Sequence, residues 1–441
     1  MNPIIPTVLA ADPSAHVWDD KGTIWLYTSH DQPGTTTHDT MQSYHVFSST
    51  DMVNWIDYGC VLSLENVPWA ISHMWAIDAC HRHGKYYLVF CAIEAATGMF
   101  RTGLAVSDLP QGPFRDIGYI KGVEWGQDPA LFVDDDDTPY LFWGAGGSCR
   151  ACQLSDDLTS AVPGTEVDLT KQLTWVFEGP FVHKYQGRYY LTYPGLYENQ
   201  WPEHMYYAIA DKPLGPYTFA GEYIPVFEGQ AGTNHGSVVE FKGKWYALHH
   251  CYWLTGMSEA RCLMCDEVHY NPDGTIQPIY PNRDGVCSTE TGESTGKVTI
   301  LLDAAGAPAM RGELRGTRAE TQVPGYWGEG YVTGFDKSYF GVVVMAQSCV
   351  QRTCRLKVRL NNPGDAVRMK ALFNDVSIYD KESDDYAYDR HFEFPHTEDW
   401  QVFDMGLVQL NVGENRLRFY NGGKHQESSL CVDSFMLEEA E

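Results

Sequence analysis

A short unit that recurs five times in the first 250 residues constrains the fold of this chain more than any other feature. Each copy has a polar residue, an apolar run, a turn rich in Gly or Asp, and a run rich in aromatic residues. This order is typical of a β-hairpin with a polar side chain at the mouth of its first strand. The five leading polar residues are Asp12, Asp78, Asp128, Glu178 and His235.

A second echo lies between the hairpins, where residues 107–114 (SDLPQGPF) resemble residues 211–217 (DKPLGPY). Copies at intervals of roughly 50 to 65 residues, with about four strands each, are typical of a β-propeller. Helical periodicity is not sustained anywhere in the sequence. We therefore predict an all-β protein in which residues 1–300 form a five-bladed β-propeller. Because the innermost strands of a propeller surround its axis, we expect the five leading residues to line one funnel.

The pattern changes after residues 287–296, a small, polar stretch with Gly that indicates a linker or a surface crossing. Residues 312–441 contain alternating strands without the leading polar residue, such as Phe340–Met345 and Arg355–Leu360. Strands at this spacing favour an antiparallel β-sandwich of jelly-roll type. We expect this second domain to be an accessory module.

The composition argues against several classes of partner. The formal net charge of −27 over 441 residues disfavours nucleic acid and anionic membranes. No apolar run approaches the length of a membrane helix. The first ten residues lack the basic start of a signal sequence, and the twelve cysteines lack the spacing of a disulfide framework. We expect a cytoplasmic protein, or a secreted one if a leader has been removed.

The leading carboxylates suit hydrolysis of a glycosidic bond, which needs one protonated carboxyl to release the leaving oxygen and one carboxylate to activate water. Apolar neighbours of Glu178, such as Phe177 and Phe181, would raise its pKa, so we predict it as the acid. We predict Asp12 as the base and Asp128 as a third carboxylate that raises the pKa of the acid. An Asp before Pro is also a common turn former, but five corresponding copies favour a site.

These residues resemble glycoside hydrolase family 43. The motifs that carry the resemblance are Ala11-Asp12-Pro13, Trp75-Ala-Ile-Asp78, Gln127-Asp128-Pro129, Glu178-Gly179-Pro180 and Thr233-Asn-His235-Gly. The resemblance implies an inverting mechanism with Asp12 as base, Glu178 as acid and Asp128 as modulator of the acid's pKa. It also implies that Arg261 contacts the substrate and that a structural calcium or a water lies near His235. No cofactor is implied for the chemistry.

The resemblance further implies contacts to the sugar. Trp75 would form a wall of the site with Asp78 beside it, and His30 and Asp31 would reach the rim. Other aromatic residues predicted as pocket walls are Phe100, Trp125, Trp201 and Trp253. Related fructoside-cleaving propellers carry Arg before the Asp and Cys after the Glu. Gln127 and Gly179 stand there in this chain and disfavour that family.

The second domain resembles family 6 carbohydrate-binding modules, through Ala319-Glu320, the Trp327–Val332 stretch and Val432-Asp433. The resemblance implies a structural calcium held by Glu320 and Asp433. Tyr326, Trp327 and Trp400 are candidates for stacking on sugar, although aromatic residues of a sandwich more often belong to its core.

We therefore predict an exo-glycosidase that removes terminal pentose units from hemicellulose, with arabinoxylan and xylo-oligosaccharides as substrates. An α-L-arabinofuranosidase is the first choice. A β-D-xylosidase or a β-D-galactofuranosidase is the alternative on the same scaffold. A propeller that binds sugar without catalysis is the alternative from another class, and the presence of all three carboxylates counts against it.

Overall fold

The computed structural model describes residues 1–18, 22–287, 297–349, 351–379, 391–422 and 428–440. Most of the turn expected at residues 19–22 and of the linker expected at residues 287–296 lies outside these ranges. By its internal contacts the chain divides into two compact units. The first contains Met1–Asn54, Ser63–Pro110 and Phe114–Gly296, and the second contains Trp55–Leu62, Gln111–Pro113 and Lys297–Glu441.

The first unit consists of five antiparallel sheets that follow one another along the chain. The first contains β1 (Ala10–His16), β2 (Ile24–His30) and β3 (Ser43–Ser49). The second contains β5 (Ala70–Ser72), β6 (Ile77–Arg82), β7 (Lys85–Glu94), β8 (Phe100–Ser107) and β9 (Arg115–Tyr119). The third contains β10 (Ala130–Val133), β11 (Pro139–Trp143), β12 (Arg150–Gln153) and β13 (Val167–Asp168). The fourth contains β14 (Phe181–Tyr185), β15 (Arg188–Gly195), β16 (His204–Ala210) and β17 (Thr218–Ile224), and the fifth β18 (Ser237–Phe241), β19 (Lys244–Cys251) and β20 (Cys262–Val268).

The predicted hairpin is present in every one of these sheets, because β1–β2, β6–β7, β10–β11, β14–β15 and β18–β19 all pair antiparallel. The two echoed segments join β8 to β9 and β16 to β17. Four 3-10 turns complete the unit: η1 (His38–Thr40), η2 (Leu64–Asn66), η3 (Thr170–Gln172) and η4 (Tyr197–Asn199).

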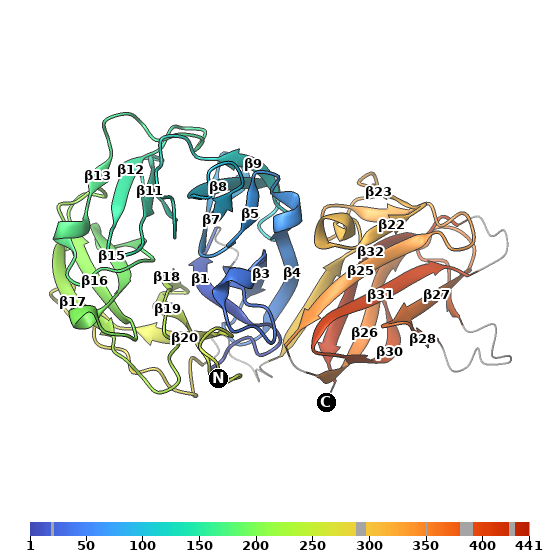
Figure 1. The fold of residues 1–441 in the computed structure, drawn as a ribbon. Coiled ribbons are helices and arrows are strands. Elements are labelled where there is room, and N and C mark those ends of the chain that lie inside the picture. Colours follow the sequence, from blue (N-terminus) through green and yellow to red (C-terminus); the bar gives the residue numbers. More distant parts are fainter. Residues whose placement is uncertain (19–21, 288–296, 350, 380–390, 423–427, 441) are drawn as a thin grey trace. The chain divides into compact units, whose positions relative to one another are not determined.

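The five sheets surround a common centre (Figure 1). The first strands of the five hairpins contact one another in a ring, from β1 to β6, β10, β14 and β18 and back to β1. This is the arrangement of a five-bladed propeller. The ring closes where the N-terminal segment runs along the last sheet, since Ile4 N–H donates to Leu263 O at 2.9 Å and Ala10 N–H to Arg261 O at 3.1 Å. The closure brings the start of β1 beside Arg261.

Apolar side chains fill the spaces between neighbouring sheets. Leu141 and Trp143 of β11 pack with Val89 of β7, and Tyr190 of β15 packs with Ala247 of β19. These cores fix the sheets around the centre, so the ends of the innermost strands are held in place by packing rather than by loops. No helix among the described residues has the length and apolar character needed to cross a membrane.

The second unit is also all β. One of its sheets has the strand order β4 (Trp55–Ser63), β21 (Val298–Asp303), β32 (Cys431–Glu439), β24 (Tyr331–Thr333) and β23 (Arg318–Glu320), with β26 (Arg352–Asn361) and β30 (Gln401–Leu410) attached. The other contains β22 (Glu313–Arg315), β25 (Gly341–Ser348), β31 (Gly413–Asn421), β27 (Val367–Phe373), β28 (Val376–Ile378) and β29 (Phe392–Phe394). The 3-10 turn η5 spans Ala307–Met310. A single hydrophobic core takes residues from both sheets, such as Leu356, Phe419 and Phe435.

Candidate active site

A cavity of about 150 Å³ gathers four of the five leading residues of the repeat. Asp12, Asp128, Glu178 and His235 line it together with Trp75, Thr233 and Arg261. These side chains come from all five sheets or the loops that lead into them. The prediction that the leading residues meet in one funnel is therefore correct for these four.

Asp12 enters the cavity from an irregular point of β1. The pairing of β1 with β2 shifts register between Ala11 and Ser14, as at a β-bulge, and Asp12 has a positive φ of 51°. A bulge turns one side chain away from the regular alternation of a strand, and a left-handed residue other than Gly costs about 1–3 kcal/mol. The surrounding structure offsets this cost and aims the carboxylate into the cavity.

Two side chains hold the Asp12 carboxylate, and a third contacts its backbone. Its Oδ2 accepts a hydrogen bond from the Ser29 hydroxyl at 2.5 Å, and its Oδ1 lies 3.2 Å from Nη1 of Arg261. The backbone N–H of Asp12 donates to Nδ1 of His250 at 3.2 Å. Burial by itself raises the pKa of Asp12, but neighbouring groups, of which the Arg261 guanidinium acts most strongly, outweigh it and hold this pKa well below its usual range. Asp12 is therefore a carboxylate at neutral pH.

Arg261 is itself fixed by a second carboxylate. Asp31, which is fully buried, accepts from Nε of Arg261 at 3.0 Å, from its Nη2 at 2.9 Å and from its backbone N–H at 2.7 Å. Two parallel bonds of this kind fix the plane of a guanidinium. The prediction that Asp31 reaches the rim of the pocket is therefore wrong. Asp31 orients Arg261 instead.

Glu178 lies three residues before the start of β14 and faces the cavity, to which it is partly exposed. Gly179 after it has a φ of 53°, and a Cβ there would lie 3.0 Å from Nδ1 of His235 and from Cγ of Pro194. Only Gly combines this backbone conformation with so close an approach. The protein around Glu178 excludes water, and this burial, followed by the negative charge of Glu203, raises the pKa of Glu178 well above its usual range.

Asp128 precedes β10 with a positive φ of 48° and is 4% exposed. Its Oδ1 lies 3.8 Å from Sγ of Cys91. Burial, then the charges of Glu178 and Asp12, raise the pKa of Asp128 well above its usual range. The cavity thus contains one carboxylate that is ionised and two carboxyl groups that retain protons to higher pH. This separation is the electrostatic requirement for an acid and a base that work at one bond.

Asp78, the fifth leading residue, does not line the cavity. Its Oδ2 accepts from Leu131 N–H at 2.6 Å, and its Oδ1 accepts from Ala79 N–H at 2.7 Å and contacts Nε2 of His16 at 2.8 Å. The prediction of substrate contact is wrong for Asp78. It lies inside β6, whereas Asp128 and Glu178 precede their strands, so its carboxylate ties β6 to β10 instead.

His30 also lies away from the cavity. Its Nδ1 contacts Oγ of Ser43 at 3.0 Å and its ring packs on His45 at 4.5 Å. Adjacent residues at the end of a strand point to opposite sides, so Asp31 and His30 cannot both face Arg261. Trp75 does line the cavity, donates from Nε1 to His38 O at 3.0 Å and packs on Phe100. The other predicted walls, Phe100, Trp125, Trp201 and Trp253, are not among the lining residues.

His235 lines the cavity with Nδ1 3.9 Å from Oδ1 of Asp12. Burial is the largest influence on His235 and lowers its pKa, so the ring is neutral and available as a metal ligand. Calcium prefers six to eight oxygen ligands. Among the described residues no group of three ligating side chains includes His235, so an ion there would take most of its shell from water.

Two residues at the site carry no clear signal in the sequence. His250 accepts from Asp12 through Nδ1 and contacts the carbonyl of Thr233 through Nε2 at 3.0 Å, which fixes its tautomer. Glu203 is fully buried beside Glu178. Both fall outside the leading positions of the repeat, and only the folded chain places them here.

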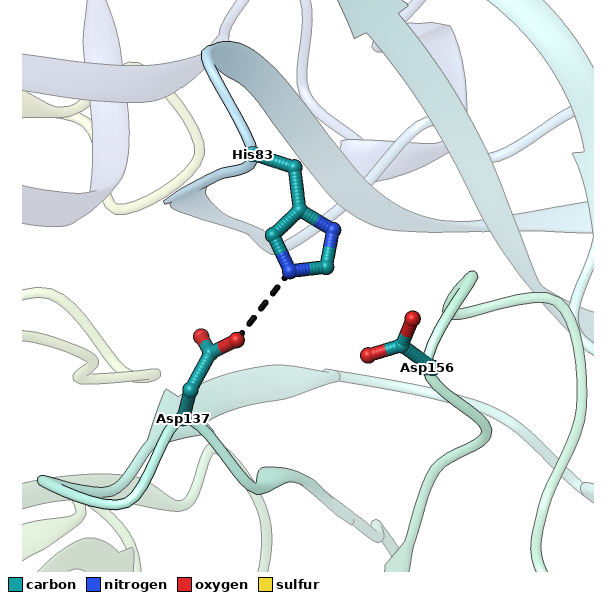
Figure 2. Close-up of side chains that lie close together, drawn as sticks. All are labelled: His83, Asp137 and Asp156. Atoms are coloured by element: carbon teal, nitrogen blue, oxygen red, sulfur yellow. Dashed lines mark hydrogen bonds and ion pairs between the residues drawn. The ribbon is translucent and has the colours of Figure 1, made fainter.

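A separate cluster of His83, Asp137 and Asp156 lies on the surface of the first unit (Figure 2). Its ligating atoms are within 4.8 Å of one another. Arg82 already supplies a positive charge, with Nη2 2.9 Å from Oδ2 of Asp137 and 2.8 Å from Oδ1 of Asp156. The cluster is therefore an ion-pair network that joins the turn after β6 to two neighbouring loops.

In the second unit, the geometry contradicts the predicted calcium site. Asp433 is fully buried, accepts from Trp327 N–H at 3.1 Å and forms an ion pair with Arg359. Glu320 instead pairs with Arg318 at 2.6 Å. Because β26 pairs with β32 so that Arg359 lies opposite Ser434, a guanidinium takes the place beside Asp433 that a cation would need. Arg359 also lies over the rings of Trp327 and Trp400, at 4.1 and 5.3 Å.

The chain is similar to known proteins over its first unit. Xylosidase/arabinosidase 43A of Humicola insolens is 34% identical over 336 residues, which are 64% of this chain and 100% of that protein. An arabinoxylan arabinofuranohydrolase of Paenibacillus polymyxa is 30% identical over 343 residues, 65% of this chain and 52% of that protein.

Solved structures are similar as well. A GH43 β-xylosidase/α-arabinofuranosidase from a compost microbial metagenome, in complex with xylotriose and in calcium-free form, aligns with a TM-score of 0.58 and 33% identity over 64% of this chain and 97% of that chain. An arabinoxylan arabinofuranohydrolase from Bacillus subtilis, in complex with cellotetraose, is 23% identical with a TM-score of 0.59 over 100% of this chain and 97% of that chain, and shows the fold. The profile of glycosyl hydrolases family 43 matches residues 1–276, and the chain belongs to this family.

Proposed function

We propose that this protein is an inverting exo-glycosidase that removes terminal pentose residues from hemicellulose. The observation that carries the proposal is that Asp12 and Glu178 line one small cavity in opposite electrostatic settings. Arg261 lowers the pKa of Asp12, while burial raises the pKa of Glu178. This separation suits a base and an acid, as hydrolysis with inversion requires.

In the proposed reaction, Glu178 donates its proton to the glycosidic oxygen as the bond from that oxygen to the anomeric carbon breaks. Asp12 accepts a proton from a water molecule, whose oxygen bonds the anomeric carbon from the opposite face. Asp128 lies in the same cavity, where burial and the charges of Glu178 and Asp12 raise its own pKa, so it is placed to orient the substrate beside the acid. Arg261, fixed by Asp31, holds Asp12 in place and lines the cavity beside it.

The size of the cavity supports exo action on a single sugar. Its volume of about 150 Å³ is well below the roughly 300 Å³ at which sites for larger ligands begin. Trp75 offers an aromatic face to such a ring. We propose α-L-arabinofuranose on arabinoxylan as the first substrate and β-D-xylose as the alternative, because relatives carry both activities in their names. β-D-galactofuranose is a third choice, since a β-D-galactofuranosidase of Aspergillus niger is 25% identical.

Product analysis tests this proposal directly. Incubation with arabinoxylan and, separately, with linear xylo-oligosaccharides should release single arabinose or single xylose units. No larger fragment should be cut from either substrate. Proton NMR during the first minutes should show the sugar with inverted anomeric configuration. Glu178→Gln should lose hydrolysis of both substrates and still bind the sugar. If the intact protein hydrolyses neither these substrates nor a panel of nitrophenyl pentosides, the non-catalytic binding propeller is the correct reading.

We propose further that the second unit is a β-sandwich module related to family 6 carbohydrate-binding modules. Its two sheets share one core, and Trp327 keeps 45% of its surface exposed. Sugar binding by this face is tested by retention of the full chain on insoluble arabinoxylan, with Trp327→Ala as the variant. Equal retention of both proteins would exclude this face as the binding site.

The proposal assigns no cofactor to the chemistry. A calcium ion at His235, with water completing its shell, would supply positive charge beneath the sugar site. Calcium that binds only the folded protein raises stability by about 2.7 kcal/mol at a concentration of 100 times the dissociation constant. Added calcium should therefore raise the melting temperature of the intact protein, and His235→Ala should remove this response. An unchanged response in the variant would place the ion elsewhere.

A further inference from the structure

The general acid Glu178 has a carboxyl neighbour that no predicted role accounts for. Glu203 lies between η4 and β16 in the same sheet, and its side chain has no exposed surface. It stands outside the repeated unit and is not among the residues that line the cavity. A buried carboxyl group is costly unless other groups satisfy it, so its presence beside the acid needs a reason.

The backbone and one oxygen of Glu203 are firmly held. Oε2 accepts from the backbone N–H of Asn234 at 2.6 Å, and the N–H of Glu203 donates to Gly232 O at 3.1 Å. The carbonyl of Glu203 also accepts from the side-chain amide of Gln230. The same loop continues into His235, which lines the cavity. Glu203 is therefore locked in position relative to the site.

The other oxygen, Oε1, is buried and receives no hydrogen bond from a donor. The Glu203 side chain instead meets the carboxyl group of Glu178. Two ionised carboxylates in this position only repel one another, whereas one proton between them converts the contact into a hydrogen bond. A proton on the pair would allow one hydrogen bond between the two carboxyl groups.

The surrounding charges decide how many protons the pair keeps. Asp12 and Asp31 are two buried acids that share the single cation Arg261. Burial lowers the pKa of His235 and of His250, so neither ring adds positive charge. Burial likewise raises the pKa of both Glu178 and Glu203, and the charge of Glu203 raises the pKa of Glu178 further. A dianionic pair is strongly disfavoured in this setting.

The position of the proton within the pair follows from the backbone contact. The backbone N–H of Asn234 donates a hydrogen bond to Glu203, and this bond favours negative charge on Glu203. Glu178 receives no such bond from the loop and faces the open cavity. The proton therefore lies on Glu178, where a leaving oxygen can take it.

Building on the proposed glycosidase function, we propose that Glu203 is a positioning residue for the general acid. Its carboxyl group shares one proton with Glu178 and keeps that proton on the oxygen that faces the cavity. When the leaving oxygen takes the proton and its bond to the anomeric carbon breaks, the pair becomes fully charged. This charge repulsion then favours uptake of a new proton from water, which resets the acid for the next turnover.

The test is the pH dependence of kcat/KM for Glu203→Gln in the full chain, with exposed Glu228→Gln as the matched control. The amide removes the like charge and donates a hydrogen bond to the Glu178 carboxylate, and both effects favour ionised Glu178. The alkaline limb should therefore move to lower pH by about one unit, a roughly tenfold loss of activity on that side. The control should keep the wild-type profile.

Two substrates separate this role from a structural one. The oligosaccharide that wild type cleaves, an arabinosylated xylo-oligosaccharide or xylobiose, needs acid assistance, whereas a dinitrophenyl pentoside has a leaving group that departs without it. Glu203→Gln should lose at least tenfold more activity on this oligosaccharide than on the dinitrophenyl substrate. Equal losses with the alkaline limb in its wild-type position would overturn the proposal.

A second variant guards against misfolding of the first. Glu203→Asp keeps the charge, but its side chain is one methylene shorter and places the carboxylate farther from Glu178. The alkaline limb of this variant should therefore fall between those of wild type and Glu203→Gln. If Glu203→Gln does not fold, this variant alone decides, and an unmoved limb overturns the proposal. The glycosidase function is judged separately, because it fails only if wild-type protein does not hydrolyse the substrates or if Glu178→Gln still cleaves the oligosaccharide normally.

Discussion

Replacement of Glu178 by Gln should make the stability of the protein less sensitive to alkaline pH. In the folded protein, burial and Glu203 raise the pKa of Glu178 above its ordinary value of 4.5. At pH values between the ordinary pKa of the unfolded chain and the raised pKa of the folded chain, the folded chain holds a proton that the unfolded chain has lost. Stability therefore falls as pH rises through this window. Gln has a similar shape and does not titrate, so the variant lacks this part of the decline.

The size of the effect follows from proton linkage. One such group changes the free energy of unfolding by at most about 1.4 kcal/mol per pH unit. Between pH 5.5 and 7.5 the variant should gain up to about 2.7 kcal/mol relative to wild type. At about 2 °C per kcal/mol for a large domain, this is a relative gain of about 5 °C in melting temperature.

Thermal unfolding of the full chain at several pH values measures this difference. The second unit is the same in both proteins, so its contribution cancels when the two melting temperatures are subtracted. Glu228→Gln, on an exposed side chain, should show a difference that stays constant with pH. If the difference between Glu178→Gln and wild type also stays constant, Glu178 is not held protonated by the fold, and the assignment as general acid loses its physical basis.

Three further substitutions test single contacts. Asp12→Asn should lower kcat by about 10²–10⁴-fold because the base is lost, with sugar binding retained in calorimetry; a loss below tenfold would exclude Asp12 as the base. Asp31→Asn should cost about 3–5 kcal/mol in chemical denaturation because the buried Arg261 loses its bidentate partner, and a cost below about 1 kcal/mol would contradict that arrangement. Gly179→Ala should destabilise the protein by about 1–3 kcal/mol, since its φ is 53° and the added methyl group would crowd His235; wild-type stability would show that the loop can adapt.

The sequence was sufficient to predict the hairpin repeat and most of the cavity. A propeller places corresponding positions of each repeat at the same end of its axis, so Asp12, Asp128, Glu178 and His235 converge as expected. Asp78 shows the limit of this reasoning. It lies inside β6, as Asp12 lies inside β1, but β6 lacks the register shift at which Asp12 enters the cavity, and the Asp78 carboxylate accepts from the backbone of β10 instead.

Other features depend on contacts that no repeat encodes. Glu203 reaches Glu178 from a loop of the same sheet, and its partner loop at Gly232–Asn234 belongs to the next repeat. Asp31 meets Arg261 only because the ring closes through the N-terminal segment. In the second unit, the register of β26 against β32 decides that Asp433 meets Arg359. Such pairings follow from three-dimensional packing, and the order of residues alone does not reveal them.

The pH dependence of kcat/KM in wild type, compared between the oligosaccharide that it cleaves and a dinitrophenyl pentoside, is the most direct test of the acid and base pair. On the oligosaccharide, activity should fall on the acid side as Asp12 gains a proton and on the alkaline side as Glu178 loses one. The dinitrophenyl leaving group needs no acid, so with this substrate the alkaline limb should vanish while the acid limb remains. An alkaline limb that persists unchanged on the dinitrophenyl pentoside would contradict the account.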